Sequence, residues 1–155
     1  MTVAVEVPAT TSTTSTTTTT TTTSTTLPPT ELTTSIGTSV QGRDIDVVQR
    51  VDIPGARLAV DDLNRVVVLV VGVIHGDEQA GLEVIKELRA MLPSEIPANV
   101  DLWLLPTINP DGVAAKQRHN ANQVDLNRNF PYKWGMIAEL GNWEYSGPSA
   151  ASEPE

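Results

Sequence analysis

Cysteine is absent from the 155 residues, and histidine occurs only twice. Without cysteine, the chain can form neither disulfides nor the thiolate zinc sites that stabilise many small domains. Any metal site must therefore be built from histidine nitrogens and carboxylate oxygens. The absence of cysteine does not by itself indicate a redox compartment.

Basic residues are scarce. Ten Lys and Arg stand against nineteen Asp and Glu, which gives a formal net charge of −9. Binding to a nucleic-acid backbone needs clustered basic side chains that displace counterions from the phosphates. The scattered basic residues argue against a nucleic-acid partner, and a charged substrate group would have to be held by a few individually placed arginines.

Long apolar runs are missing as well. A run such as Val66 to Ile74 is well short of the roughly 20 residues that a membrane-spanning helix needs. The sequence therefore predicts no membrane-spanning segment. A chain of this length accommodates one folded domain plus a tail.

The N-terminal region has almost nothing to bury. Every residue from Thr10 to Thr26 is Ser or Thr. Such a tract cannot offset the entropy lost on ordering, so we expect residues 1–34 to be a disordered spacer, O-glycosylated if the protein is exported. The start "MTVAVEVP" lacks the basic and apolar parts of a signal peptide. Either the natural chain begins earlier or the protein is not exported; we expect the former, with an extracytoplasmic location.

Residues 35–155 carry the patterns of an α/β domain. Apolar and polar residues alternate along "GRDIDVVQRVD", which predicts a half-buried strand before a turn at Pro54 and Gly55. The continuous β-branched run from Val66 to Ile74 is typical of a central strand buried on both faces. Leucine and isoleucine then recur at helical spacing between Glu78 and Met91.

A second apolar strand, "NVDLWLLPTI", follows the predicted helix and is closed by the turn residues "NPDG". Strand, helix and strand in this order predict a right-handed crossover and a parallel pair. We therefore expect an α/β fold with a mixed, mostly parallel sheet flanked by helices. Residues 113–135 are rich in Asn and predict a long loop, which in compact domains is often functional. The C-terminal residues provide no closing element, so the domain is expected to be truncated.

The motif "HGDE" stands where the apolar run meets the predicted helix. Ligands of open α/β sheets bind outside the carboxyl ends of the strands, and His75 lies one residue past such an end. A nitrogen of His75 and a carboxylate oxygen of Glu78 can converge on one ion, and zinc accepts this mixture. The spacing is also compatible with a polar turn in which Glu78 stabilises the helix start. A catalytic zinc site needs three protein ligands, of which this pair supplies two.

Four motifs in a fixed order decide between these readings by resemblance. "HGDE" after a buried strand, then "NPDG", an arginine, "VDLNRNFP" and "YSGPSAASEPE" resemble the zinc carboxypeptidase family, particularly bacterial members that act on cell-wall peptides. The similarity extends from Gly42 to Glu155. The resemblance implies a Zn²⁺-dependent metallocarboxypeptidase that hydrolyses a C-terminal peptide bond, with a peptide or a peptidoglycan peptide as substrate.

By this resemblance, His75 and Glu78 match the first two zinc ligands, from the set of two His and one Glu known in carboxypeptidase A. Asp125 matches the acid that accepts a hydrogen bond from the first histidine ligand. Such a carboxylate fixes the imidazole tautomer and strengthens the imidazole as a donor to the metal. The plainer alternative for Asp125 is an acid that caps a loop.

The same resemblance assigns roles to three residues that would contact substrate. Asn127 and Arg128 match the pair that holds the terminal carboxylate, and the forked guanidinium explains a restriction to chain ends. Arg118 matches the arginine that polarises the scissile carbonyl and stabilises the oxyanion, with a plain surface arginine as the alternative.

The remaining histidine and the tryptophans receive no catalytic role. His119 is not expected to be the third ligand, because the family's third ligand is a histidine in the later half of the domain. We expect it to shape the loop beside Arg118. Trp103 is expected in the core, and Trp134 and Trp143 are assigned no function.

The family's third ligand, its glutamate general base and its substrate-covering tyrosine all lie beyond the point that matches Glu155. We therefore expect a fragment of a longer product that is inactive alone, and peptidase activity from residues 35–155 would contradict this. Two other functions remain compatible with the sequence. One is a zinc deacylase of the aspartoacylase or succinylglutamate desuccinylase type, and the other is a non-catalytic cell-wall binding module.

Overall fold

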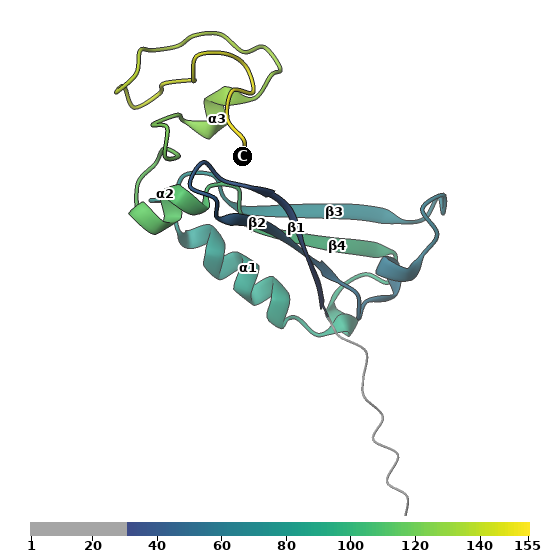
Figure 1. Ribbon diagram of the computed structural model, residues 1–155. Helices are drawn as coiled ribbons and strands as arrows, with labels where there is room; N and C mark the ends of the chain where they lie inside the picture. Colours follow the sequence, from purple (N-terminus) through teal and green to yellow (C-terminus); the bar gives the residue numbers. More distant parts are fainter. Residues whose placement is uncertain (1–30) are drawn as a thin grey trace, which may run out of the picture.

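The computed structural model describes residues 31–155, so residues 1–30 of the predicted spacer lie outside the described part of the chain. The described residues form one mixed sheet, three α-helices and two short 3-10 helices (Figure 1). In chain order the elements are β1 (Glu31–Thr38), β2 (Asp44–Arg50), the 3-10 helix Pro54–Arg57, β3 (Val66–Val73), α1 (Ala80–Ala90), the 3-10 helix Pro93–Glu95, β4 (Val100–Thr107), α2 (Pro110–Ala115) and α3 (Leu126–Asn129).

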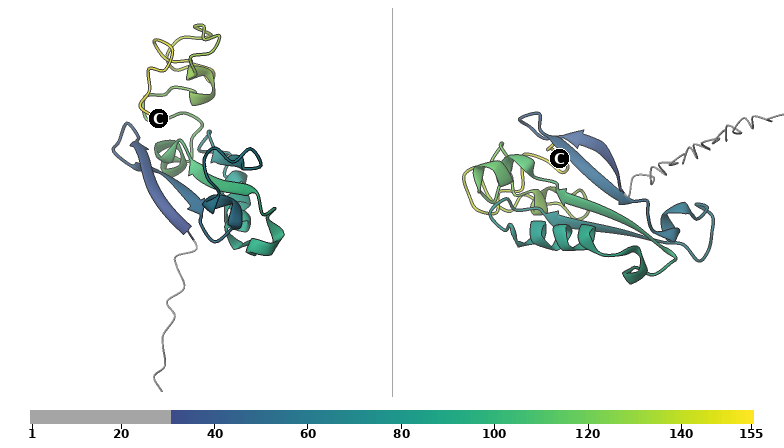
Figure 2. Two further views of the ribbon diagram at one scale, coloured as in Figure 1. Left: turned by 90° about the vertical axis from the view of Figure 1, so that its right-hand side faces the viewer. Right: turned by 90° about the horizontal axis from the view of Figure 1, so that it is seen from below.

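The strand order is β1-β2-β4-β3. β3 and β4 are parallel, as the strand–helix–strand pattern predicts, whereas β1 with β2 and β2 with β4 are antiparallel. The α/β class and the mixed sheet are thereby confirmed. Because β3 and β4 run the same way, the residues that follow both strands meet at one end of the sheet. The chain after α2 gathers at that same end (Figures 1 and 2).

The first strand of the described residues, β1, begins at Glu31, four residues before the expected start of the folded region. β1 pairs with β2 from Glu31 opposite Arg50 to Thr38 opposite Asp44. The side chains of β1 are mostly exposed and polar, so no apolar alternation marks this strand. It is held by main-chain pairing and by the carboxylate of Glu31, which accepts two bonds from Arg89 of α1 at 3.0 and 2.6 Å. The hydrophobic pattern alone therefore predicts a domain boundary, at residue 35, that is too late by four residues.

α1 covers one face of the sheet, and the main core lies between them (Figure 1). Alternate residues of the strands point to this face, because side chains along a strand alternate between the two faces. The buried members of the cluster are Val48, Ile53, Ile85, Ile96, Leu102 and Leu104. A smaller cluster of Ile45, Val47 and Leu105 lies on the opposite face, where Trp103 packs against it as a partly buried residue.

Arg50 ties α1 to the end of β2. Its guanidinium is almost fully buried and pairs with both carboxylate oxygens of Asp52 at 2.9 and 2.8 Å. It also donates to the carbonyls of Leu88, Arg89 and Met91 at 2.9, 3.2 and 2.9 Å. The last carbonyls of a helix have no partner within the helix, so Arg50 caps α1 from outside. The hydrogen bond from Arg50 also keeps the pKa of Asp52 below its usual value.

β3 is not the doubly buried central strand that its apolar run predicts. Among the described residues it has β4 as its single neighbour and so forms an edge of the sheet. Val68 and Val70 pack on the cluster beneath α1, whereas the side chains of Val67 and Leu69 are 58% and 56% exposed. A continuous apolar run permits burial on two faces, but only the α1 face is covered in the described part of the chain.

The connections at the end of the parallel strands also differ from expectation in one respect. The "NPDG" residues begin helix α2 rather than forming a simple turn, and Asn109 caps that helix by accepting a bond from the Gly112 amide at 2.8 Å.

None of the helices formed by residues 31–155 is long and apolar enough to cross a membrane.

The exposed edge of β3 generates a prediction about self-association. Edge strands expose unpaired backbone groups that can pair with another chain. In natural proteins, bulges and polar side chains at such edges hinder that pairing. β1 has a register irregularity between Ser35 and Gly37 and a polar surface, whereas β3 has neither. We expect the chain to associate through β3, and Leu69→Lys to shift its sedimentation toward the 16.6 kDa single chain.

The matched control is Thr34→Lys, which adds the same charge to exposed β1. Both substitutions lie on the surface and should change the free energy of unfolding by no more than about 0.5 kcal/mol. Equal self-association of the Leu69→Lys and wild-type chains in analytical ultracentrifugation would refute a β3 contact.

Candidate active site

His75 stands just beyond the end of β3, in the short connection to α1. The Glu78 amide donates to the His75 carbonyl at 3.0 Å, which folds the "HGDE" residues into a turn. Gly76 is needed here for close approach rather than for an unusual backbone angle: a Cβ on Gly76 would lie 1.9 Å from the carbonyl carbon of Gly112. The absence of a side chain at Gly76 thus lets the connection after β3 pack directly on α2.

The imidazole of His75 lies between two carboxylates. Its Nε2 is 3.0 Å from Oδ1 of Asp125, and its Nδ1 is 3.1 Å from Oε1 of Glu78. Nη1 of Arg118 can only donate and lies 3.1 Å from Nδ1, so in the neutral ring we assign the proton to Nε2, which donates to Asp125. The lone pair of Nδ1 then faces Glu78. This is the orientation that a metal-binding histidine adopts when a carboxylate holds its other nitrogen.

Asp125 is fully buried and receives hydrogen bonds from several directions. Arg118 donates to Oδ2 through Nε at 3.1 Å and Nη2 at 2.8 Å, and the Asn127 amide donates to Oδ1 at 3.0 Å. Burial by itself would raise the pKa of this carboxyl group. The hydrogen bonds from Arg118 and His75 outweigh burial and hold the pKa of Asp125 below its usual value. Asp125 therefore remains an anion that orients two neighbours.

Arg118 completes the cluster, because it also reaches the nitrogen of His75 that does not face Asp125. Its Nη1 is 3.1 Å from Nδ1 of His75 and 3.4 Å from Oε1 of Glu78. Two acceptor atoms that face each other at 3.1 Å repel unless a positive group lies beside them, and this guanidinium is that group. Four of the six predicted site residues, His75, Glu78, Arg118 and Asp125, are thus brought together.

The donor set of this cluster fits zinc. Two ligands bound at about 2.0–2.2 Å to one tetrahedral ion lie roughly 3.3–3.6 Å apart. The observed separation of 3.1 Å between Nδ1 and Oε1 is close to that range, and the 65% exposed side chain of Glu78 is free to adjust. Within residues 31–155, no group of three or more His, Asp or Glu side chains converges on a common point. The described residues therefore offer two side chains, His75 and Glu78, that fit as zinc ligands.

Asn127 and Arg128 lie in the short helix α3, whose N-cap is Asp125. The guanidinium of Arg128 donates to Oε1 of Glu144 at 3.1 Å through Nη2, and no contact joins it to His75 or Glu78. Both residues line a pocket of about 160 Å³ together with aromatic side chains that include Trp134. α3 thus connects Asp125, which lies behind His75, to the predicted substrate clamp, but the clamp itself stands apart from His75 and Glu78.

His119 lies outside the cluster of His75. Its Nε2 is 2.9 Å from the carbonyl of Trp143, and the two rings meet edge to face at 6.0 Å between centroids. It therefore packs within the loop beside Arg118, the placement expected from the sequence. The indole of Trp143 also covers Arg118, whose Cζ lies 5.0 Å from the ring centroid. The sequence alone gave no signal for that contact.

Sequence reasoning also missed three buried asparagines that hold the long loop. Asn109 donates to the carbonyls of Ile74 and Arg118 at 3.0 and 3.2 Å and so joins the end of β3 to the arginine loop. Asn120 donates to the carboxylates of Glu153 and Glu155 at 2.7 and 3.0 Å. Asn129 donates to two carbonyls and one hydroxyl in residues 146–152. The density of Asn in this loop was the available signal.

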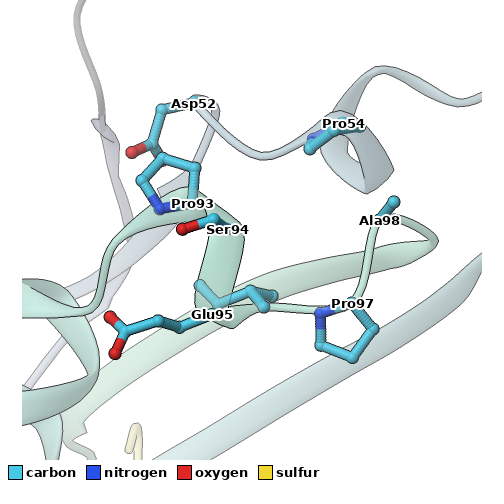
Figure 3. A pocket seen from close by; sticks show the side chains of 8 residues that line it. Asp52, Pro54, Pro93, Ser94, Glu95, Pro97 and Ala98 are labelled. Carbon is cyan, nitrogen blue, oxygen red and sulfur yellow. The ribbon is translucent and has the colours of Figure 1, made fainter.

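A pocket of about 620 Å³ lies at the opposite end of the sheet, before the start of β4 (Figure 3). Its two carboxylates are both engaged in structural bonds. Asp52 pairs with Arg50, and Oε2 of Glu95 accepts from the Leu92 amide at 2.6 Å. The remaining lining residues are Pro54, Pro93, Ser94, Ile96, Pro97 and Ala98, of which only Ser94 has a polar side chain (Figure 3).

The sequence profile of the family described as zinc carboxypeptidase matches residues 20–155. The catalytic chain of human carboxypeptidase N is 37% identical over 137 residues, which cover 74% of this chain and 29% of the human protein. The chain thus spans less than a third of the length of that relative.

Solved structures show the same fold. Carboxypeptidase A from Helicoverpa armigera superposes with a TM-score of 0.62 and 24% identity, covering 81% of this chain and 35% of that one. The murein-tripeptide amidase MpaA from Escherichia coli O157 gives a TM-score of 0.57 and 27% identity, covering 82% of this chain and 52% of that one. With its family profile matched over most of its length, the chain belongs to the zinc carboxypeptidase family.

Proposed function

We propose that this chain carries the zinc-ligand pair, the oxyanion arginine and the carboxylate clamp of a metallocarboxypeptidase. The observation that carries the proposal is the convergence of Nδ1 of His75 and Oε1 of Glu78, with Asp125 holding the opposite nitrogen of the imidazole. In this proposal His75 and Glu78 hold Zn²⁺. When bound, zinc supplies Lewis-acid polarisation of a carbonyl and lowers the pKa of a bound water.

The remaining residues define what is bound and how charge is stabilised. The Arg118 guanidinium, already fixed by Asp125, offers Nη1 to negative charge that develops on a carbonyl oxygen beside the ligand pair. Arg128 and Asn127 hold the terminal carboxylate of a peptide through the forked guanidinium and the amide. A requirement for that carboxylate would limit hydrolysis to the last residue of a chain.

The substrate class that we propose is a peptide, with cell-wall peptides as the narrower proposal. The resemblance to the murein-tripeptide amidase supports the narrower choice. The Ser/Thr-rich segment from Thr10 to Thr26 supports an extracytoplasmic location. The 37% identity to a carboxypeptidase catalytic chain favours a carboxypeptidase over a deacylase. Assays on peptides and on N-acyl amino acids would separate those two activities.

Zinc binding by the full chain tests the ligand pair. We expect isothermal titration calorimetry to show one zinc per chain and His75→Ala to abolish or strongly weaken it. Loss of a direct ligand should reduce affinity by more than loss of an outer partner, which costs about 10- to 100-fold. His119→Ala is the matched control, because that histidine bonds to the Trp143 carbonyl instead. Equal zinc affinity of the His75→Ala and His119→Ala chains would exclude the proposed site.

The outer role of Asp125 is tested by Asp125→Asn. We expect the zinc affinity to fall by about 10- to 100-fold, because the neutral amide no longer enforces one imidazole tautomer. The substitution also unpairs the buried guanidinium of Arg118, and breaking such pairs costs about 3–5 kcal/mol of stability. Calorimetry is therefore accompanied by a urea unfolding curve. Asp52→Asn is the control for loss of an arginine-paired carboxylate away from the site.

The role of Asp125 can also be tested on the wild-type chain, by measuring which nitrogen of His75 carries the proton. Two-bond ¹H–¹⁵N NMR spectra of His75 should show the proton on Nε2 and an unprotonated Nδ1. A proton on Nδ1, or an Asp125→Asn chain that binds zinc as tightly as the wild type, would contradict the role given to Asp125.

The carboxylate clamp is tested with N-acetyl-alanine and its amide as paired ligands. We expect the acid to bind more tightly than the amide, and Arg128→Lys to weaken binding of the acid about tenfold, which corresponds to 1.4 kcal/mol. Lysine keeps the charge but loses the two parallel donors. Arg57→Lys, a substitution outside this region, is the matched control. An NMR titration in which acid and amide bind equally would argue against a clamp at Arg128.

A further inference from the structure

Residues 143–145 contact the charged groups of the candidate site one after another. The face of the Trp143 indole lies 5.0 Å from Cζ of Arg118, and the carbonyl of Tyr145 accepts from the amide of Asp125 at 2.8 Å. Between them, Oε1 of Glu144 accepts from Arg128 at 3.1 Å. This segment, which runs into the start of the "YSGPSAASEPE" motif, thus reaches three residues of the site.

The backbone of this segment is fixed without help from the Trp143 side chain. Asn142 accepts from the Glu144 amide through its side chain at 3.0 Å and from the Tyr145 amide through its carbonyl at 3.2 Å. The Trp143 carbonyl is bonded to His119 at 2.9 Å. Exchange of the indole for another side chain therefore leaves the bonds that form the segment in place.

Arg118 needs a contact of the kind that Trp143 provides. Asp125 holds one edge of the guanidinium through Nε and Nη2, and Nη1 points at Glu78 and His75. These bonds lie in the plane of the group and leave its two faces without partners. An aromatic face within about 6 Å of a guanidinium attracts it and excludes water from that side. The Arg118 side chain is only 9% exposed although that of Trp143 lies at the surface.

We propose that Trp143 is a positioning residue for Arg118: its ring fixes the tilt of the guanidinium and shields the Arg118–Asp125 pair from solvent. The consequence for chemistry rests on the proposed function, in which Nη1 of Arg118 stabilises charge on a carbonyl oxygen. The contact itself belongs to the chain whether or not zinc binds. Trp143 touches no reacting atom and acts through Arg118 alone.

The proposal is tested by the Nε–H signal of Arg118 in NMR spectra of the full chain, identified by its absence from Arg118→Lys. In the wild type we expect a signal displaced by the indole ring current and slow to exchange with solvent. Trp143→Leu should remove the displacement and speed exchange roughly 2- to 30-fold, the range expected from the strength of cation–π contacts. Trp143→Phe keeps an aromatic face and should restore slow exchange.

Tyr132→Leu is the matched control, because that exposed ring contacts Lys133 and not Arg118. An undisplaced wild-type signal would overturn the proposal without any variant. Equal exchange in wild type and Trp143→Leu, or equally fast exchange in Trp143→Leu and Trp143→Phe, would also overturn it. Zinc titration of the same chains separates the two ideas. An Arg118 signal that is undisplaced in the wild type, with zinc binding retained, refutes the role of Trp143 alone, whereas zinc binding that is insensitive to His75→Ala refutes the proposed function.

Discussion

The buried carboxylate of Asp125 is the interaction on which the candidate site depends. A charge in the protein interior is tolerated only when charged and hydrogen-bonding partners surround it. Asp125 has such partners in His75, Arg118 and the Asn127 amide. Each partner is oriented by the bond it makes, so one anion sets the imidazole tautomer, the direction of a guanidinium and the start of α3. The site is therefore organised by electrostatics more than by apolar packing.

The same constraint explains how a chain with few basic residues builds a polar centre. Arg118 uses three nitrogens on three neighbours, and Arg50 at the other end of the sheet satisfies a carboxylate and three carbonyls. Arg50 fixes α1 against β2, and Arg118 fixes the loop that follows α2 against the residues after β3. Because the direction of α1 is fixed, Glu78 stands at a defined place before its first turn.

The sequence predicted what depends on local pattern, and it missed what depends on tertiary partners. Helical spacing located α1, and the position of His75 after an apolar strand, three residues before Glu78, predicted that these two side chains would meet. β1 was placed too late because main-chain pairing leaves no trace in side-chain polarity. β3 was expected to be buried on two faces because an apolar run cannot reveal how many neighbours a strand has. The contact between Trp143 and Arg118 joins residues from separate loops, so no spacing rule indicates it.

The loop that follows α2 shows how a site can be held rigidly with little apolar core. Three buried asparagines in and beside this loop, Asn109, Asn120 and Asn129, carry donors and acceptors that a carbonyl, a hydroxyl or a carboxylate of a distant segment can use. A satisfied amide network specifies geometry more narrowly than apolar contact does, because hydrogen bonds depend on angle as well as on distance. Asn120 and Asn129 thereby join "VDLNRNFP" to "SGPSAASEPE". The C-terminal residues thus support the arginine and carboxylate positions although they supply no ligand themselves.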